Sequence, residues 1–407
     1  MPTLLLSLLI AGGNVAIAAE YSSAFRIDSS YEIDDNIQLR ETNETSIAGY
    51  TLSPGLALNY RTPTFSAGLK GTLAFADFDE EQYNSDDQKV ALTLTETTQH
   101  NVFSLGAGVN RDSSRTSELL DTGRITNTAV RRKDLWLAPS WTHSINPRHA
   151  MQFSWRVQQV EYQSDNFADY DYQQLNVTWI MTLSPNNSLH VQLFGSHYEN
   201  DQRTSVNSNS YGLQMGGVIE ISQNLSLTGL AGLMKAKTNY EVAGAFDTEL
   251  TDSGIFETDL ANSSLFNNAT TVQFENTTVT LDASLKYQQQ RYSLSLNVSS
   301  KTQPSGNGYE QQSDNASMVY RYRLTERTNV GIDASYGENA SQDNSISDQR
   351  NYSSVQLAMN YKLTKTLRVG GRYRFRSQER ENTSVSAESN AVFITLTYQP
   401  QTQKWSR

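Results

Sequence analysis

The stretch MQFSWRVQ, residues 151–158, alternates apolar and polar side chains at every position. Because successive side chains of a β-strand point to opposite faces, this stretch predicts a strand with one apolar and one polar face. The same alternation recurs in residues 174–183 and 292–299. Repeated strands of this kind, about ten residues long, are typical of transmembrane β-barrels.

The segments between the alternating stretches form a second pattern, in which short turns and long polar connectors follow each other without a break. Outer-membrane barrels have tight periplasmic turns and longer external loops, so this pattern predicts about 18 strands with both chain ends in the periplasm. The short turns lie near 61–63, 100–101, 146–148, 185–187, 223–224, 289–291, 326–327 and 364–366. The long connectors cover 35–45, 77–87, 112–128, 163–169, 199–209, 241–271, 302–313, 337–350 and 378–387.

The predicted fold class is therefore all-β, a single closed antiparallel transmembrane β-barrel. Closure is required in lipid, because an open sheet edge would leave backbone groups unpaired there. A soluble propeller or sandwich is the alternative, but it does not explain why the long connectors fall at every second position. We expect the barrel to span residues 20–400, with residues 401–407 as a short periplasmic tail after a last strand that ends at Tyr398.

The N-terminal segment has a different character. An apolar run over residues 4–19 ends in Ala16-Ile17-Ala18-Ala19, which predicts a secretory signal peptide over residues 1–19. The first three residues carry no lysine or arginine, which departs from the usual signal pattern. A buried N-terminal strand or helix is the alternative.

Composition excludes several classes of protein. The 407 residues include no cysteine, which excludes disulfide frameworks and thiolate metal sites. The formal net charge of −11 argues against nucleic acid as a partner, because nucleic acid selects clustered positive charge. The five histidines lie in separate hairpins without metal-binding spacing, so we expect no enzymatic activity, no metal site and no cofactor.

Strand parity places a group of basic side chains on the polar face. In residues 367–375 the apolar side chains alternate with arginines, and a charge facing lipid near the midplane would cost about 2–4 kcal/mol. The basic side chains are therefore predicted to point into the lumen. The predicted lumen residues are Arg321, Arg323, Lys362, Arg368, Arg372, Arg374 and Arg376, with Arg156 from the stretch quoted first.

Two interpretations of this arginine stripe stay open. It attracts an anionic or carboxylate-bearing solute, or it belongs to an ion-pair ladder in which Asp282, Asp333 and loop carboxylates neutralise it.

Two of the predicted loops also have more than one interpretation. The acidic residues of 77–87 form either a solvated loop or a Ca²⁺ site. The longest connector, 241–271, is rich enough in apolar residues to fold into or over the barrel mouth.

The opening SSYEIDDNI, residues 29–37, and the ending 390–400, with LTYQP at 396–400, resemble the β-barrel porin family encoded in exopolysaccharide operons. The resemblance covers nearly all of the mature chain and supplies no site residues. It implies an outer-membrane conduit that exports a polysaccharide. The arginine stripe, which follows from strand parity and not from the resemblance, is compatible with an acidic polysaccharide. The expected partners are outer-membrane lipid, a polysaccharide or other polar or anionic solute, and a periplasmic export partner. The alternative is a non-conducting barrel that anchors or binds glycan through its long loops.

Overall fold

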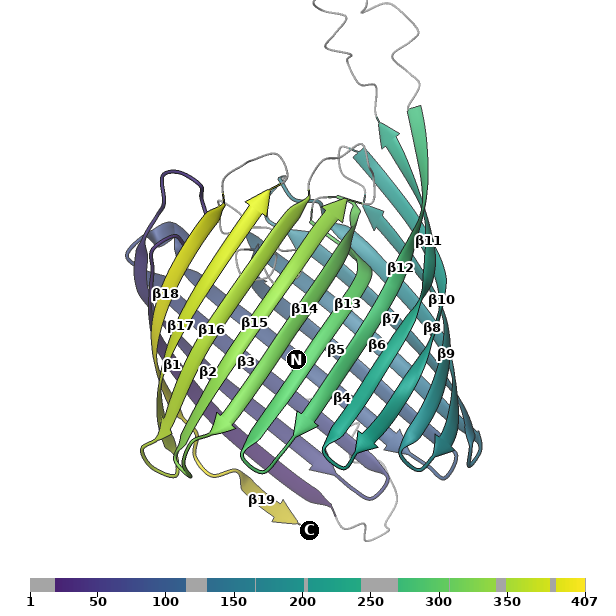
Figure 1. Cartoon of the computed structure of the whole chain (residues 1–407), viewed down its shortest axis with the longest axis horizontal. Helices are drawn as coiled ribbons and strands as arrows, with labels where there is room; N and C mark the ends of the chain where they lie inside the picture. The colour runs from purple at the N-terminus through teal and green to yellow at the C-terminus, as the bar shows by residue number, and fades with distance from the viewer. Residues whose placement is uncertain are drawn as a thin grey trace, which may run out of the picture.

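The computed structural model shows a closed barrel of tilted antiparallel strands (Figure 1). Each of the strands β1 to β18 pairs with the next, and β18 pairs back onto β1 over Ile27↔Tyr398 to Asp34↔Ala391. Closure pairs the strands into a continuous wall, as lipid requires. β12 extends beyond this wall, because its pairing with β13 covers only Leu281–Gln288. The predicted fold class and the number of strands are confirmed. The structure describes residues 19–114, 130–164, 166–200, 204–242, 270–306, 308–341, 349–380 and 386–406.

The strands alternate with connectors much as the sequence predicts. Their bounds are β1 Glu20–Asp34, β2 Ile47–Arg61, β3 Phe65–Phe78, β4 Ser85–Thr97, β5 Asn101–Ser113, β6 Arg131–Asn146, β7 His149–Tyr162, β8 Tyr170–Ser184, β9 Asn187–Asn200, β10 Thr204–Ser222, β11 Leu225–Val242, β12 Thr270–Gln288, β13 Tyr292–Pro304, β14 Glu310–Arg323, β15 Thr328–Ser341, β16 Arg350–Lys362, β17 Leu367–Arg380 and β18 Ala387–Tyr398. One turn of 3₁₀-helix, η1, covers Glu81–Tyr83.

The C-terminal tail carries a strand that the sequence did not predict. β19, Gln403–Ser406, pairs with Glu20–Ser23 at the start of β1, below the stretch of β1 that β18 occupies. The Trp405 ring stacks on Tyr21 with centroids 5.9 Å apart and planes 2° from parallel. The tail therefore continues the closing edge of the barrel past Tyr398. β19 lies at the end of the barrel that bears the short turns (Figure 1).

One face of most strands carries large exposed apolar side chains, as the outer surface of a membrane barrel must. In β2 these are Leu52, Leu56 and Leu58, and in β18 they are Val392 and Ile394. The residues between them face inward. No helix among the described residues is long and apolar enough to cross a membrane. Residues 1–18 of the predicted signal peptide and residues 243–269 of the longest connector lie outside the described residues.

Candidate functional site: the lumen wall

The inner face is identified by contacts that reach between strands that are not neighbours. Tyr162 of β7 and Asn200 of β9 lie on the face opposite the exposed Trp155 and Leu193. Both touch the connector between β13 and β14, which comes from a distant part of the wall: Asn200 Nδ2 donates to Gly308 O at 2.9 Å. Only the lumen lies between these walls, so the face of Tyr162 and Asn200 is the inner one.

The β17 arginines lie on this inner face. Tyr373 is 42 % exposed on the outside, whereas Arg376 is only 3 % exposed. Arg372 and Arg374 flank the ring of the buried Phe393, with guanidinium carbons 4.4 and 4.8 Å from its centroid. The alternation read from the sequence therefore agrees with the side-chain orientations in β17.

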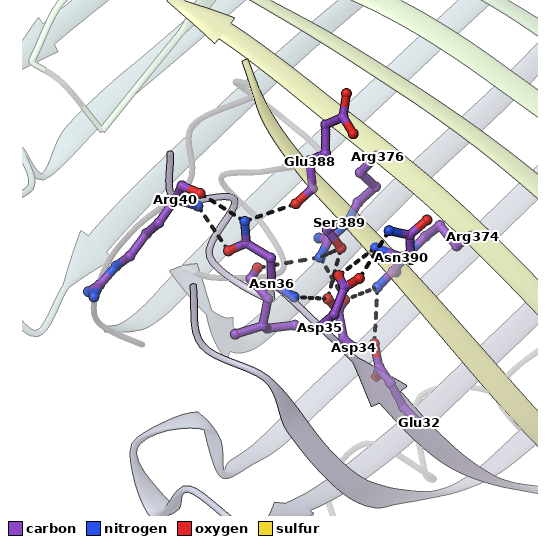
Figure 2. A network of polar contacts seen from close by, with 11 residues as sticks. Glu32, Asp34, Asp35, Asn36, Arg40, Arg374, Arg376, Glu388, Ser389 and Asn390 are labelled. Carbon is purple, nitrogen blue, oxygen red and sulfur yellow. Dashed lines mark hydrogen bonds and ion pairs between the residues drawn. The ribbon is translucent and has the colours of Figure 1, made fainter. Parts of the chain in front are cut away.

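Two of these arginines are held by carboxylates near the long-connector end of β1 (Figure 2). Asp34 is fully buried; its Oδ2 accepts from Arg376 Nη2 at 2.7 Å and from Arg374 Nη2 at 3.1 Å. Arg374 Nη2 also donates to Glu32 Oε1 at 3.0 Å. Ser389 Oγ donates to the other oxygen of Asp34 at 2.8 Å. Because β18 separates β17 from β1, this network bridges the strand that closes the barrel.

A third arginine of the stripe forms an ion pair nearer the end of the barrel that bears the short turns. Arg321 Nη1 and Nη2 donate to the two oxygens of Asp333 at 2.5 and 3.0 Å, and Gln356 Nε2 donates to the same carboxylate at 3.2 Å. The ion-pair interpretation thus holds for Arg321 with Asp333. The partners of Arg374 and Arg376 lie in β1, which the sequence did not suggest.

Four other basic residues belong to the stripe. Within the described part of the chain, Arg323, Lys362, Arg368 and Arg372 form no ion pair. Lys362 and Arg368 stand directly opposite each other across the β16–β17 pairing, on the same face. Both lie at strand ends next to a short turn, which places them toward the periplasmic opening. Asp28, the nearest acid along this row, is bound by Arg26 at 2.6 Å.

Arg156 lies in the wall formed by the first half of the chain. Its guanidinium carbon is 5.4 Å from the centroid of the Trp136 ring, and the indole lies against two glycines of β5. A Cβ at Gly108 would come within 2.6 Å of this ring, and one at Gly106 within 3.0 Å. Arg156 also donates to Gln158 at 3.4 Å. The arginine is therefore packed on an aromatic ring, away from the stripe of β14 to β17.

The long-connector end of the barrel is narrowed from one side by the β1–β2 connector. Ile37 packs with Ile47, Phe78 and Tyr83 in a buried cluster, which joins this connector to η1. Arg376 Nη2 donates to Ile37 O at 3.4 Å, so the connector is tied to the inner wall. This connector was predicted to be polar and external, but its apolar side chains turn inward.

The opposite side of the mouth holds the β13–β14 connector, which we call the strut, residues 305–310 without 307. Ala168 N donates to Gly306 O at 2.9 Å, and Ser208 Oγ donates to the buried carboxylate of Glu310 at 2.6 Å. Around it lies a cluster of buried hydrophobic residues: Val130, Val160, Tyr162, Phe167, Tyr170, Tyr172, Tyr198 and Val206. The strut therefore reaches across the lumen and docks on β7 to β10.

The acidic segment 77–87 makes contacts within the protein. Arg131 forms ion pairs with Asp86 and Asp87, and Asn84 Nδ2 donates to Asp77 Oδ1 at 3.0 Å. Among the described residues, no group of three or more His, Asp or Glu side chains is arranged to hold a metal ion.

Comparison with known proteins gives one partial family match. The model described as "Putative beta-barrel porin-2, OmpL-like" matches residues 237–406. No curated protein sequence matches the chain. Among solved structures, OccAB3 of Acinetobacter baumannii is 12 % identical, with 95 % of this chain and 99 % of that chain covered and a TM-score of 0.44. The outer membrane protein opdK of Pseudomonas aeruginosa is 10 % identical, with 95 % of this chain and 99 % of that chain covered and a TM-score of 0.45. The ferric-catecholate import receptor Fiu of E. coli K12 is 10 % identical, with 92 % of this chain and 81 % of that chain covered and a TM-score of 0.47.

The closed barrel, its outer apolar surface and its charged inner wall together indicate how the chain is placed in the cell. The chain is a porin-like β-barrel of the outer membrane. The predicted localisation is confirmed. Its lumen wall, rather than its loops alone, is the candidate functional surface.

Proposed function

We propose that the barrel is a conduit for polar, anionic solutes across the outer membrane, and that an acidic exopolysaccharide strand leaving the cell is among them. The observation that carries the proposal is the set of basic side chains on the inner wall without ion-pair partners among the described residues. Arg323, Lys362 and Arg368 are exposed, and each lies at a strand end next to a short turn. Basic side chains that line a pore favour anions.

The unpaired charges are concentrated toward one end of the pore. The exposed and unpaired cations lie toward the periplasmic opening, whereas Arg374 and Arg376 near the outer mouth are neutralised by Glu32 and Asp34. An anion arriving from the periplasm therefore meets attractive charge first and a nearly neutral wall later. A pore needs binding that is favourable enough for entry and weak enough for release. The gradient along the wall has this property.

The proposal is tested by the zero-current potential of the purified barrel in a planar bilayer under a KCl gradient. The wild type should prefer chloride. The double variant Lys362→Gln/Arg368→Gln, which removes two unpaired charges, should shift the potential toward cation preference.

The matched control is Arg321→Gln/Asp333→Asn. It removes a lumen ion pair without changing the net charge, since the pair sums to zero. Its zero-current potential should equal that of the wild type. A cation-preferring wild type, or equal shifts in the two double variants, would refute the proposal. A barrel without conductance would favour the alternative of a surface protein that binds glycan through its loops.

A further inference from the structure

A recess opens in the inner wall beside the C-terminal strand, away from the arginine stripe. It has a volume of about 810 Å³ and is lined by β1 to β4 and by β19. Small-molecule sites in proteins have volumes of about 300–1,000 Å³. The position next to the starts of β1 and β3 and the ends of β2 and β4 places it at the periplasmic opening.

Three cations and one acid line the recess. Arg61, Lys70 and Lys404 carry the positive charge, and Glu20 the negative. Within the described residues none of the three cations forms an ion pair, and all three are exposed. Lys404 stands opposite Ser22 across the β1–β19 pairing, which puts it on the inner face. The tail strand therefore brings a charge to the lumen that the barrel strands alone would lack.

Small side chains make the space beside these cations. Lys70 is paired with Ala57 on one side and Ala91 on the other, so no large side chain covers its stem. Gly68 leaves room at Asn59, because a Cβ at Gly68 would lie 3.3 Å from Asn59 Oδ1. Asn59 Nδ2 donates to Ser22 Oγ at 3.3 Å, and Asn59 remains exposed.

We infer that this recess binds a carboxylate-bearing sugar, with Lys70 and Lys404 holding the carboxylate and Asn59 the hydroxyl groups. Ammonium groups attract carboxylate, and exposed amides and hydroxyls exchange hydrogen bonds with sugar hydroxyls. The excess of cations over acids disfavours a cationic ligand. The inference deepens the proposed function by naming a docking site at the periplasmic entrance.

The test is binding of tri-galacturonate to the full-length barrel in detergent micelles, measured by isothermal titration calorimetry. In low salt, Lys70→Gln/Lys404→Gln should bind the trimer about tenfold more weakly than the wild type, since two charged contacts of modest strength are lost. Lys404→Gln alone alters only an exposed tail residue and should show part of the loss.

The matched control is Lys133→Gln/Lys237→Gln, which removes two exposed lysines from the outer face. It should bind like the wild type, and neutral maltotriose should bind to none of the proteins. The inference is overturned if the affinity of Lys70→Gln/Lys404→Gln equals that of the wild type, if the control loses as much, or if maltotriose binds equally well. Displacement of the trimer by inorganic phosphate at equal concentration would overturn the assignment to a sugar.

Binding in micelles does not require passage through the barrel. A barrel that binds tri-galacturonate at the recess but conducts nothing would refute the proposed function and leave this inference standing. A barrel that conducts anions but shows no loss of binding in Lys70→Gln/Lys404→Gln would refute this inference and leave the proposed function standing.

Discussion

The carboxylate of Asp34 in the first strand binds the guanidinium of Arg376 in the seventeenth at 2.7 Å, across the strand that lies between them. Both side chains are almost fully buried, at 0 % and 3 % exposure. Since β1 and β18 form the closing pair, the contact ties three strands together at the seam. We interpret Asp34 and Arg376 as residues that stabilise closure rather than as part of the solute path.

Arg376→Gln should therefore lower the free energy of unfolding by about 1.5–3 kcal/mol, because the buried Asp34 carboxylate loses the shorter of its two guanidinium contacts and keeps those to Arg374 and Ser389. Arg26→Gln breaks the exposed pair with Asp28 and should cost about 0–1 kcal/mol. Equilibrium urea unfolding in detergent, followed by tryptophan fluorescence, measures both. Equal costs for the two substitutions would contradict a role for Asp34 and Arg376 in the seam.

The strut predicts a change in conductance when its anchors are removed. Asn200→Ala/Glu310→Gln deletes the bond from Asn200 to Gly308 and weakens the one from Ser208 to Glu310. With fewer contacts to β9 and β10, the strut should leave the lumen more often, and single-channel current should rise and become noisier. Asn209→Ala, on the outer face, is the control. Unchanged current in the double variant would show that the strut does not restrict the pore.

A substitution at Gly308 should also raise the current, here by disturbing the backbone of the strut. Its φ is +86°, a conformation that costs residues with a Cβ about 1–2 kcal/mol. A Cβ there would also lie 2.9 Å from Asn200 Nδ2. Gly308→Ala should thus raise the open current, whereas Gly71→Ala, where nothing lies within 4 Å, should not. Indistinguishable currents for the two alanine variants would contradict this prediction.

Much of the fold follows from the sequence, because the two-residue period of side chains and the alternation of short and long connectors are local properties. The orientation of Arg374 also follows, since its neighbours Tyr373 and Phe375 are apolar. Its partners Glu32 and Asp34 do not follow. They depend on the register between the last and first strands, which no local pattern fixes.

Two other features of the structure are only weakly indicated by the sequence. Ile37 and Tyr83 are apolar residues inside connectors that otherwise read as polar, and the structure buries both. The tail 399–406 shows an apolar residue only at Trp405, too little alternation to predict β19. Its pairing depends on the unpaired start of β1, a feature of the closed barrel as a whole.

The anion preference should depend on salt. Exposed charges such as Lys362 and Arg368 are screened over about 10 Å at 0.1 M and about 3 Å at 1 M ionic strength. The ratio of chloride to potassium permeability should accordingly fall toward one as the mean salt concentration rises at a fixed gradient ratio. A ratio that does not change with salt would contradict selectivity by these charges.

The most direct measurement of the central claim is flux through the barrel itself. Proteoliposomes containing the full chain are loaded with tri-galacturonate or with maltotriose, and release of each sugar is followed at low salt against liposomes without protein. The account predicts release of both sugars through the protein, with the acidic trimer leaving faster than the neutral one and losing this advantage in Lys362→Gln/Arg368→Gln. Release of neither sugar, or faster release of maltotriose, would contradict it.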